Sequence, residues 1–224
     1  MNRVEKKIAE RKKRILKLLS KLKELFPHAS MVLNYSNNFE LLVAVILSAQ
    51  CTDKMVNSVT EELFKKYVTL DDYVNADVAQ FEEAIKSTGF YKNKAKNVLG
   101  AAKVIKEKFS GKVPETMEEM LTIPGVARKT ANVVLGNAYG IVLGIAVDTH
   151  VRRFAIRFDL SGYTDPVRIE QDLMRLLPKK EWFNFTYYMI EYGRQVCGAR
   201  KHDCIDHPLT KIYPKAARLW PKAK

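Results

Sequence analysis

Apolar residues recur along most of this chain at the three- and four-residue spacing of a helix that is buried on one face. Near the amino end, Val4, Ile8 and Ile15 belong to a series that continues to Phe26. Spacing of this kind predicts an amphipathic helix over residues 3–26.

Similar patterns predict further helices, separated by short polar or glycine-containing breaks. No alternating apolar and polar run with an Asn-Gly or Asp-Gly turn lies between them, so we expect no sheet. The ambiguous segment is 141–147, which could also form a buried strand. The expected fold class is therefore all-α, with the compact apolar segment 39–50 buried. The predicted helical segments are 54–66, 78–87, 92–108, 116–121, 128–139, 149–157, 166–176 and 181–192.

The amino-acid composition excludes several classes of protein. The chain is 47% hydrophobic and 28% charged, which excludes a disordered or low-complexity protein. Its longest apolar run, residues 41–47, is far short of the roughly 20 residues that cross a bilayer. The charged amino end lacks a secretory pattern, and three cysteines do not suit a disulfide framework. We therefore expect a cytoplasmic protein without membrane attachment.

Positive charge is concentrated at the two ends of the chain. The net charge is +13, of which residues 1–25 hold +7 and residues 194–224 hold +6, while the residues between them are neutral overall. If the ends meet in space, they form a basic surface suited to a polyanion such as DNA. The alternative is a set of lysine-rich exposed helices that bind nothing.

Residues 116–139 predict two helices joined by a tight turn. Thr116 and Glu119 fit a capping box at the start of the first helix. Gly125 supplies the positive φ that the turn needs, and the second helix begins at Arg128. Amides at the start of that helix can bind a phosphate regardless of base sequence. An ordinary corner between two helices is the alternative.

The same region carries a resemblance to a known family. The chain is similar to helix-hairpin-helix DNA glycosylases, and among them to the endonuclease III family, over roughly residues 30–205. The motifs that carry the resemblance are Leu121-Thr-Ile-Pro-Gly-Val-Ala-Arg-Lys-Thr-Ala-Asn-Val-Val134, Ala146-Val-Asp-Thr-His-Val-Arg-Arg153, Leu47-Ser-Ala-Gln-Cys-Thr-Asp53, Gly89-Phe-Tyr-Lys-Asn-Lys-Ala95 and Glu191-Tyr-Gly-Arg-Gln-Val-Cys197.

This resemblance implies a fold of two helical lobes with a DNA-binding cleft between them. Residues 31–141 would form a central barrel that carries the helix-hairpin-helix at about 116–135, and residues 1–30 with 142–224 would form the second lobe. The implied protein is a bifunctional base-excision-repair enzyme, a DNA glycosylase and AP lyase. It would remove oxidised or ring-saturated pyrimidines from duplex DNA and cleave abasic sites by β-elimination. We expect a monomer associated with the nucleoid.

Lys129 and Asp148 are the expected catalytic pair. Lys129 lies in the first turn of the second hairpin helix, where the helix dipole and partial burial would favour a neutral, nucleophilic amine. From the residues alone, a phosphate-contacting lysine and a helix N-cap are the simpler interpretations of Lys129 and Asp148. The resemblance implies a Schiff-base nucleophile at Lys129 and a carboxylate at Asp148 that stabilises the developing sugar cation and accepts a proton from the lysine.

A second group of residues matches the family's DNA contacts. Gln50 and Phe90 match loops that fill the gap left by a flipped nucleotide. A residue at the end of a helix is an equal interpretation of Gln50, and a core aromatic is the favoured interpretation of Phe90, because the family usually carries Leu there. Asp53 and His150 match pocket residues, although a lone histidine near a helix start is more often simply hydrogen-bonded. The expected backbone contacts to DNA are Gly125, Val126, Ala127, Arg128 and Thr130.

The chain departs from the family at its cysteines. The endonuclease III family ends with four cysteines separated by six, two and five residues, which bind a [4Fe-4S] cluster. Cys197 and Cys204 keep the first interval, but His207 and Tyr213 stand at the third and fourth positions. We expect no cofactor, and a loop of packing contacts in place of the cluster, made by Pro208, Ile212 and Tyr213.

Zinc is the alternative at this region. Cys197, Cys204 and His207 are suitable ligand types, but the sequence offers no evident fourth ligand, so we expect no bound metal.

Two other functions fit the same motifs. One is a mismatch glycosylase that removes thymine or uracil opposite guanine, a related enzyme with a different pocket. The other is a non-catalytic helix-hairpin-helix protein that binds DNA after losing the chemistry. The presence of Lys129 and Asp148 together favours an enzyme.

Overall fold

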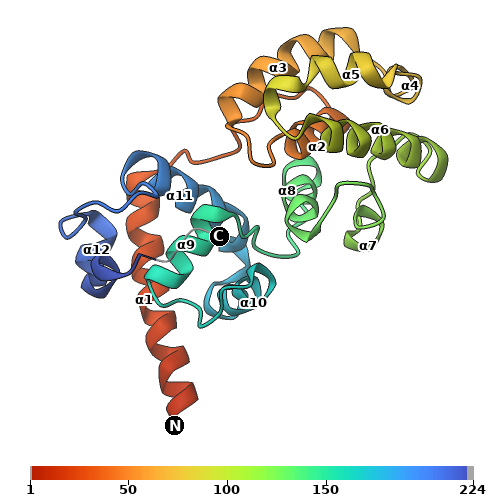
Figure 1. The fold of residues 1–224 in the computed structure, drawn as a ribbon. Coiled ribbons are helices and arrows are strands. Elements are labelled where there is room, and N and C mark those ends of the chain that lie inside the picture. Colours follow the sequence, from red (N-terminus) through yellow and green to blue (C-terminus); the bar gives the residue numbers. More distant parts are fainter. Residues whose placement is uncertain (1, 221–224) are drawn as a thin grey trace. The chain divides into compact units, whose positions relative to one another are not determined.

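A computed structural model describes residues 2–220, and these residues form helices and no strand (Figure 1). The α-helices are α1 Arg3–Leu25, α2 Asn38–Leu47, α3 Asp53–Lys66, α4 Leu70–Val74, α5 Val78–Ala84, α6 Tyr91–Lys108, α7 Met117–Met120, α8 Arg128–Tyr139, α9 Thr149–Arg157, α10 Pro166–Leu176, α11 Trp182–Gln195 and α12 Pro208–Ile212. The 3-10 helices are η1 Lys86–Thr88, η2 Lys179–Glu181 and η3 Pro214–Arg218.

The all-α prediction is confirmed, and the long amphipathic patterns each form a helix close to the expected bounds. The strand considered for residues 141–147 is wrong, because this segment has no regular secondary structure and only a bend at Gly144. The packing contacts expected for Ile212 and Tyr213 are confirmed, because both pack against the core of unit 1, but the loop expected around Pro208 is wrong. Residues Pro208–Ile212 form α12, with Pro208 at its first position, where the missing amide costs no helical hydrogen bond.

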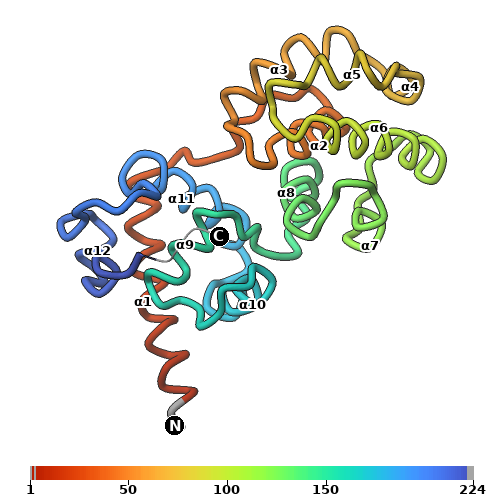
Figure 2. The backbone as a smooth tube through the Cα atoms, in the orientation of Figure 1, coloured from red at the N-terminus to blue at the C-terminus, as the bar shows by residue number. Residues whose placement is uncertain are grey.

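The chain divides into two compact units. Unit 1 comprises Met1–Ser30 and Gly144–Lys224, and unit 2 comprises Met31–Leu143. The backbone trace leaves unit 1 after α1, builds unit 2 from α2 to α8, and returns to unit 1 for α9 onward (Figure 2).

Unit 2 is built around α2. Residues Leu41–Leu47 of this helix are all buried, and the helix contacts α3, α6 and α8. Burial on every side explains why its sequence is a continuous apolar run rather than an amphipathic pattern. The surrounding helices are therefore held by a shared core, and the loops that connect them are carried on a rigid support.

Unit 1 is held together by the first helix and the carboxyl-terminal segment. Ile15, Leu18 and Leu22 of α1 are fully buried, and α1 contacts α10, α11 and α12. The two basic ends of the sequence therefore lie in the same unit. No helix within residues 2–220 combines the length and the apolar character needed to cross a membrane.

Candidate active site and nucleic-acid interface

The hairpin between α7 and α8 has the glycine turn that its sequence predicts, but only part of the predicted cap. The Thr116 hydroxyl accepts a hydrogen bond from the Glu119 amide at 3.2 Å and donates one to the Glu119 carboxylate at 2.8 Å. The Thr116 side chain therefore caps the helix, but the second bond of the capping box, from the Thr116 amide to the Glu119 carboxylate, does not form. Gly125 has a φ of +78°, and a Cβ at this residue would lie 2.7 Å from Asn97 Cβ. Glycine is required here both by the turn and by the close approach of α6.

The start of α8 presents backbone amides without a side-chain cap. Its N-cap residue is Ala127, which has no polar side-chain atom to accept from the first turn. The Val126 side chain is buried and its amide already donates to Ile123 O at 3.1 Å, so Val126 supports the turn. Lys129 is exposed, which corrects the partial burial expected for it. An anion at the start of α8 is therefore attracted mainly by the positive end of the helix.

Gln50 and Phe90 share an unusual backbone conformation. Both lie in the left-handed region, at φ of 53° and 50°, and neither is glycine. Gln50 is exposed, and Phe90 is 66% exposed although it is a large aromatic residue. The interpretation of Phe90 as a core aromatic is therefore wrong. Strained, exposed side chains at loop tips are typical of functional sites rather than of packing.

Lys94, which the sequence reasoning missed, connects these two loops. Its ammonium donates hydrogen bonds of 2.8 Å to Leu47 O, at the end of α2, and of 2.8 Å to Thr88 O, at the end of η1. The residue is only 4% exposed, and burial lowers the pKa of its amine. The buried Lys94 ammonium thus holds the backbone in place just before Gln50 and just before Phe90.

Asp148 belongs to unit 1 and is the N-cap of α9. Its Oδ1 accepts from the Val151 amide at 2.8 Å, and the residue is half-buried. The predicted capping role is therefore confirmed. Capping fixes the direction of the carboxylate and holds a negative charge at the amino end of a helix.

The two predicted pocket residues also lie at helix starts. His150 is the second residue of α9 and packs against α11 so closely that a Cβ at Gly193 would lie 2.0 Å from its Nδ1. Gly193 is therefore required for the position of this histidine, which sequence reasoning did not detect. Asp53 is the first residue of α3 and belongs to unit 2 with Lys129, whereas His150 belongs to unit 1 with Asp148.

Arg157 occupies the centre of the cysteine region in unit 1. It is fully buried, and its Nη1 and Nη2 donate to Cys197 Sγ and Cys204 Sγ, both at 3.0 Å. It also donates to Ala216 O, and its guanidinium lies 4.0 Å from the ring centroid of Trp220. A carbonyl, two sulfurs and an aromatic face thus solvate this buried cation.

The residues present do not fit a [4Fe-4S] cluster. Such a cluster needs four thiolates, and the third cysteine of the chain, Cys51, belongs to unit 2. The remaining two sulfurs both accept hydrogen bonds from the guanidinium of Arg157. Burial raises the pKa of the Cys197 thiol, an effect that its hydrogen bond from Arg157 only partly offsets.

Two histidines lie beside these cysteines. His202 Nε2 is 3.7 Å from Cys197 Sγ, and the rings of His202 and His207 are 5.2 Å apart between centroids. Burial lowers the pKa of His207, and the neighbouring charges of His202 and Arg157 act in the same direction. His202 was not among the predicted ligands, because its place next to Cys197 depends on the path of the loop between them.

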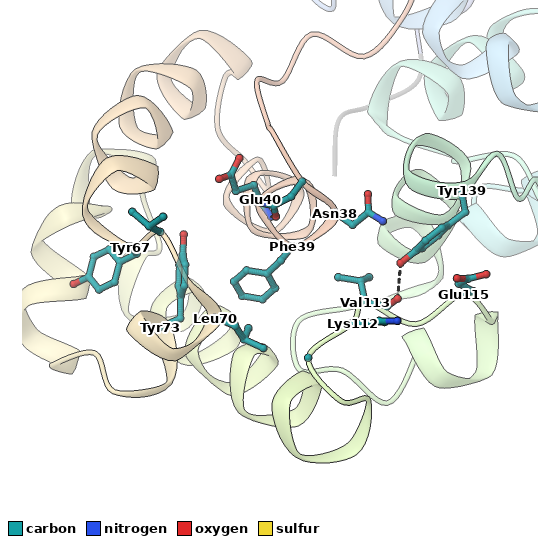
Figure 3. A pocket seen from close by; sticks show the side chains of 13 residues that line it. Asn38, Phe39, Glu40, Tyr67, Leu70, Tyr73, Lys112, Val113, Glu115 and Tyr139 are labelled. Carbon is teal, nitrogen blue, oxygen red and sulfur yellow. Dashed lines mark hydrogen bonds between the residues drawn. The ribbon is translucent and has the colours of Figure 1, made fainter.

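A cavity of about 560 Å³ in unit 2 lies apart from all these residues. Phe39, Tyr67, Tyr73 and Tyr139 line it, and Tyr139 donates a hydrogen bond to Val113 O at 2.5 Å (Figure 3). None of the predicted site residues lines this cavity. This cavity is therefore separate from the predicted site residues of unit 2, which lie on the hairpin and on the loops of Gln50 and Phe90.

Comparison with known proteins identifies the family. Residues 43–179 match the model of the HhH-GPD superfamily of base excision DNA repair proteins. The chain is 50% identical over 216 residues to an endonuclease III of Synechocystis, covering 96% of this chain and 99% of that protein.

Two solved structures are similar over most of their length. A non-covalent endonuclease III–DNA complex has a TM-score of 0.87 at 40% identity, covering 92% of this chain and 97% of that one. A trapped covalent endonuclease III–DNA intermediate has a TM-score of 0.88 at the same identity and coverage.

The chain therefore belongs to the HhH-GPD superfamily of base excision DNA repair proteins. Its relatives at 40–50% identity include endonucleases III, and it is an enzyme with DNA glycosylase and AP lyase activity. The alternative of a protein that has lost its chemistry is not favoured by these relationships.

Proposed function

We propose that this protein removes oxidised or ring-saturated pyrimidines from duplex DNA and cleaves the resulting abasic site through a Schiff base on Lys129. The observation that carries the proposal is an exposed lysine in the first turn of the second hairpin helix. It stands in a chain that is 40% identical to an endonuclease III trapped covalently on DNA.

The hairpin would hold the DNA backbone beside this lysine. The amides at the start of α8 and the positive end of the helix attract a phosphate without reading a base. Gly125 allows the turn to approach the phosphate closely, because it has no side chain. The hairpin therefore positions the DNA backbone, whereas other parts of the protein select the damaged base.

Lys129 supplies the nucleophile. Its amine forms a bond to C1′ of the nucleoside as the bond between C1′ and the base breaks, and the base leaves with the electron pair and takes up a proton. Ring opening gives a Schiff base between Nζ and C1′. Removal of a proton from C2′ then breaks the C3′–O bond and releases the 3′ phosphate. This sequence accounts for both base removal and strand cleavage with one side chain.

Asp148 supplies the negative charge that this chemistry needs. The departing base leaves positive charge on the sugar, and a fixed carboxylate stabilises it. The cap to Val151 holds Asp148 in one direction, so its charge is preorganised. We assign the same carboxylate the acceptance of a proton from the Lys129 ammonium.

Gln50 and Phe90 would fill the space that the flipped nucleotide leaves. Their side chains are exposed on loops whose directions Lys94 fixes. An apolar wedge and an amide are suited to replacing a stacked and paired base. Asp53 and His150 are proposed as residues that contact the extruded base.

Borohydride trapping tests the proposal. The protein is incubated with a duplex holding one abasic site and reduced, and a covalent adduct is expected for the wild type but not for Lys129→Ala. Lys103→Ala is the matched control, because Lys103 is an exposed lysine of α6 outside the hairpin. No adduct from the wild type, or an adduct that persists in Lys129→Ala, would contradict the assigned nucleophile.

Base release separates the substrate classes. Duplexes carrying a ring-saturated pyrimidine, thymine opposite guanine, or uracil opposite guanine are compared at equal enzyme concentration. We expect the saturated pyrimidine to be released fastest. Faster release of thymine or uracil opposite guanine would replace the proposed substrate with the mismatch class while leaving the Schiff-base chemistry in place.

We further infer that the enzyme acts as a monomer in the cytoplasm, on nucleoid DNA and without an iron–sulfur cluster. The expected lack of a cluster is supported by the cysteines: all three are free, and only two of them lie in the region that would need four ligands. A visible absorbance spectrum of purified protein tests the last point. A brown protein with broad absorbance at the blue edge of the visible would contradict it.

A further inference from the structure

We propose that Cys197, His202 and His207 form a binding site for one divalent cation of the zinc class. Ligand atoms of these three residues lie within 4.8 Å of one another. A thiolate and two imidazoles are ligands that zinc prefers over calcium or magnesium. The set differs from both the four-cysteine pattern and the ligands considered from the sequence, because His202 takes the place of Cys204.

The hydrogen bonds of His202 prepare it as a ligand. Its Nδ1 is 2.7 Å from Arg200 O, and a carbonyl oxygen can only accept, so Nδ1 carries the proton. The lone pair of the neutral ring is then on Nε2, which is 3.7 Å from Cys197 Sγ. A tetrahedral zinc ion holds a sulfur and a nitrogen about 3.6 Å apart, so this pair is already close to the required spacing.

His207 is held at a defined position with an unmet hydrogen-bonding need. It is the N-cap of α12, directly before Pro208, and its side chain caps no amide. Its Nδ1 is buried without a hydrogen-bond partner in the described part of the chain. Coordination through this nitrogen would provide the partner that the protein does not.

Arg157 separates the two cysteines into different roles. Its Nη1 donates to Cys197 Sγ, and such a hydrogen bond stabilises a thiolate in a metal site. Cys204 Sγ accepts from Nη2 of the same guanidinium and lies 3.9 Å from Ala217 O, and it is not part of the group that Cys197 forms with the two histidines. Cys197 is therefore the ligand, and Cys204 is a packing residue.

The cation would fasten the carboxyl-terminal segment of unit 1. Cys197 follows α11, His202 lies in the next loop, and His207 is the N-cap of α12, so one ion would join three successive parts of the chain. Because His202 and His207 are half-buried, water can complete the fourth position. The site would stabilise this segment where relatives with four cysteines use a cluster.

Cobalt titration of the full-length, metal-free protein tests the site. Cobalt(II) is the probe, since a tetrahedral complex with a thiolate shows visible d–d bands and a near-ultraviolet thiolate charge-transfer band. We expect saturation at one equivalent and displacement of the cobalt by zinc. The variants are Cys197→Ser, His202→Gln and His207→Gln, with Cys204→Ser as the matched cysteine control and circular dichroism as the check on folding.

The outcomes separate the ligand sets. The proposal holds if Cys197→Ser loses the charge-transfer band, if each histidine variant binds at least tenfold more weakly, and if Cys204→Ser retains the wild-type spectrum. It is overturned if no saturable complex forms, or if Cys204→Ser loses the spectrum while His202→Gln keeps it. Formation of a [4Fe-4S] cluster in place of a mononuclear complex also overturns it. If Cys197→Ser fails to fold, the histidine variants decide.

Discussion

Gly125 is held in a left-handed conformation against the side of α6. Its φ is +78°, and a Cβ added there would lie 2.7 Å from Asn97 Cβ. We expect Gly125→Ala to lower the free energy of unfolding by about 2–4 kcal/mol, through backbone strain together with the steric conflict. Urea denaturation followed by circular dichroism measures the loss.

Gly140 provides the matched control for this prediction. It also has a positive φ, +68°, but no atom lies within 4 Å of an added Cβ. Gly140→Ala should therefore cost only the backbone strain, about 1 kcal/mol. Equal losses in the two variants would show that the approach of α6 to the hairpin contributes nothing.

Asp159 joins the first helix to the turn after α9. Its carboxylate is 2.6 Å from Arg11 Nη2 and 3.2 Å from Arg14 Nη1. Burial alone would raise the pKa of this carboxyl, but the hydrogen bonds and charges of the two arginines outweigh burial and lower it. The ion pairs therefore stabilise the folded state above the ordinary pKa of about 3.8–3.9, and the stabilisation is lost as pH falls further.

Asp159→Asn tests this arrangement. Asparagine tolerates the left-handed φ of 44° at this position, so the backbone should be kept. We expect a loss of about 1–2 kcal/mol at neutral pH, reduced by solvent screening because the carboxylate is partly exposed. The difference from wild type in urea denaturation should shrink as pH falls below about 4. A difference that is constant with pH would rule out the charge as its cause.

At the residue scale, local patterns predicted the caps but not the exposed or tertiary positions. Asp148 was predicted as an N-cap because a cap depends only on the residues next to it. The exposure of Phe90 could not be predicted, because a large aromatic residue is normally expected to be buried. The closeness of His202 to Cys197 depends on a loop path that no periodicity encodes.

At the element scale, Lys94 couples α2 and η1 through their terminal carbonyls. We expect Lys94→Met to reduce kcat/KM about tenfold or more on a duplex with a damaged, paired base, because the loops of Gln50 and Phe90 lose their common support. The loss should be smaller on a substrate whose abasic site is already unpaired. Single-turnover rates on the two substrates measure the difference.

Lys103→Met is the control for this element, since it removes an exposed lysine from the same helix. It should leave both rates near the wild-type values. Lys94→Met also leaves two carbonyls without their donor, so a stability loss of about 1–3 kcal/mol is expected and is measured separately. Equal rate losses on the two substrates would reduce Lys94 to a purely structural residue.

The sequence predicted the long helices better than the short ones. The helices α1, α6 and α8 span several turns, so their apolar period is visible in the sequence. The five-residue helices α4 and α12 are too short to show a period, and both were missed. Residues 141–147 are apolar and rich in β-branched side chains, but no second strand exists in the described chain to pair with them. Strand propensity without a partner cannot produce a sheet.

At the scale of the whole molecule, the uneven charge has a structural basis. The basic ends of the sequence, with +7 and +6, both belong to unit 1, where α1 contacts α12. The rest of the chain is neutral overall, so the excess charge is not needed for folding elsewhere. Concentrated lysines and arginines destabilise a compact unit by mutual repulsion and are best explained by a polyanionic partner.

Binding of undamaged duplex DNA should therefore weaken steeply with salt. For about four to six phosphate contacts, the affinity should fall on the order of 10²–10³-fold between 50 and 200 mM salt. Replacing exposed Lys12 and Lys13 of α1 with Gln should make the slope of log Kd against log salt shallower by about two. The paired control, Lys103→Gln with Lys108→Gln in α6, should leave the slope unchanged, because the excess charge does not lie in unit 2. If both pairs of substitutions change the slope equally, the phosphate contacts are not confined to the basic ends. If the affinity does not change with salt, the basic ends do not bind DNA through charge.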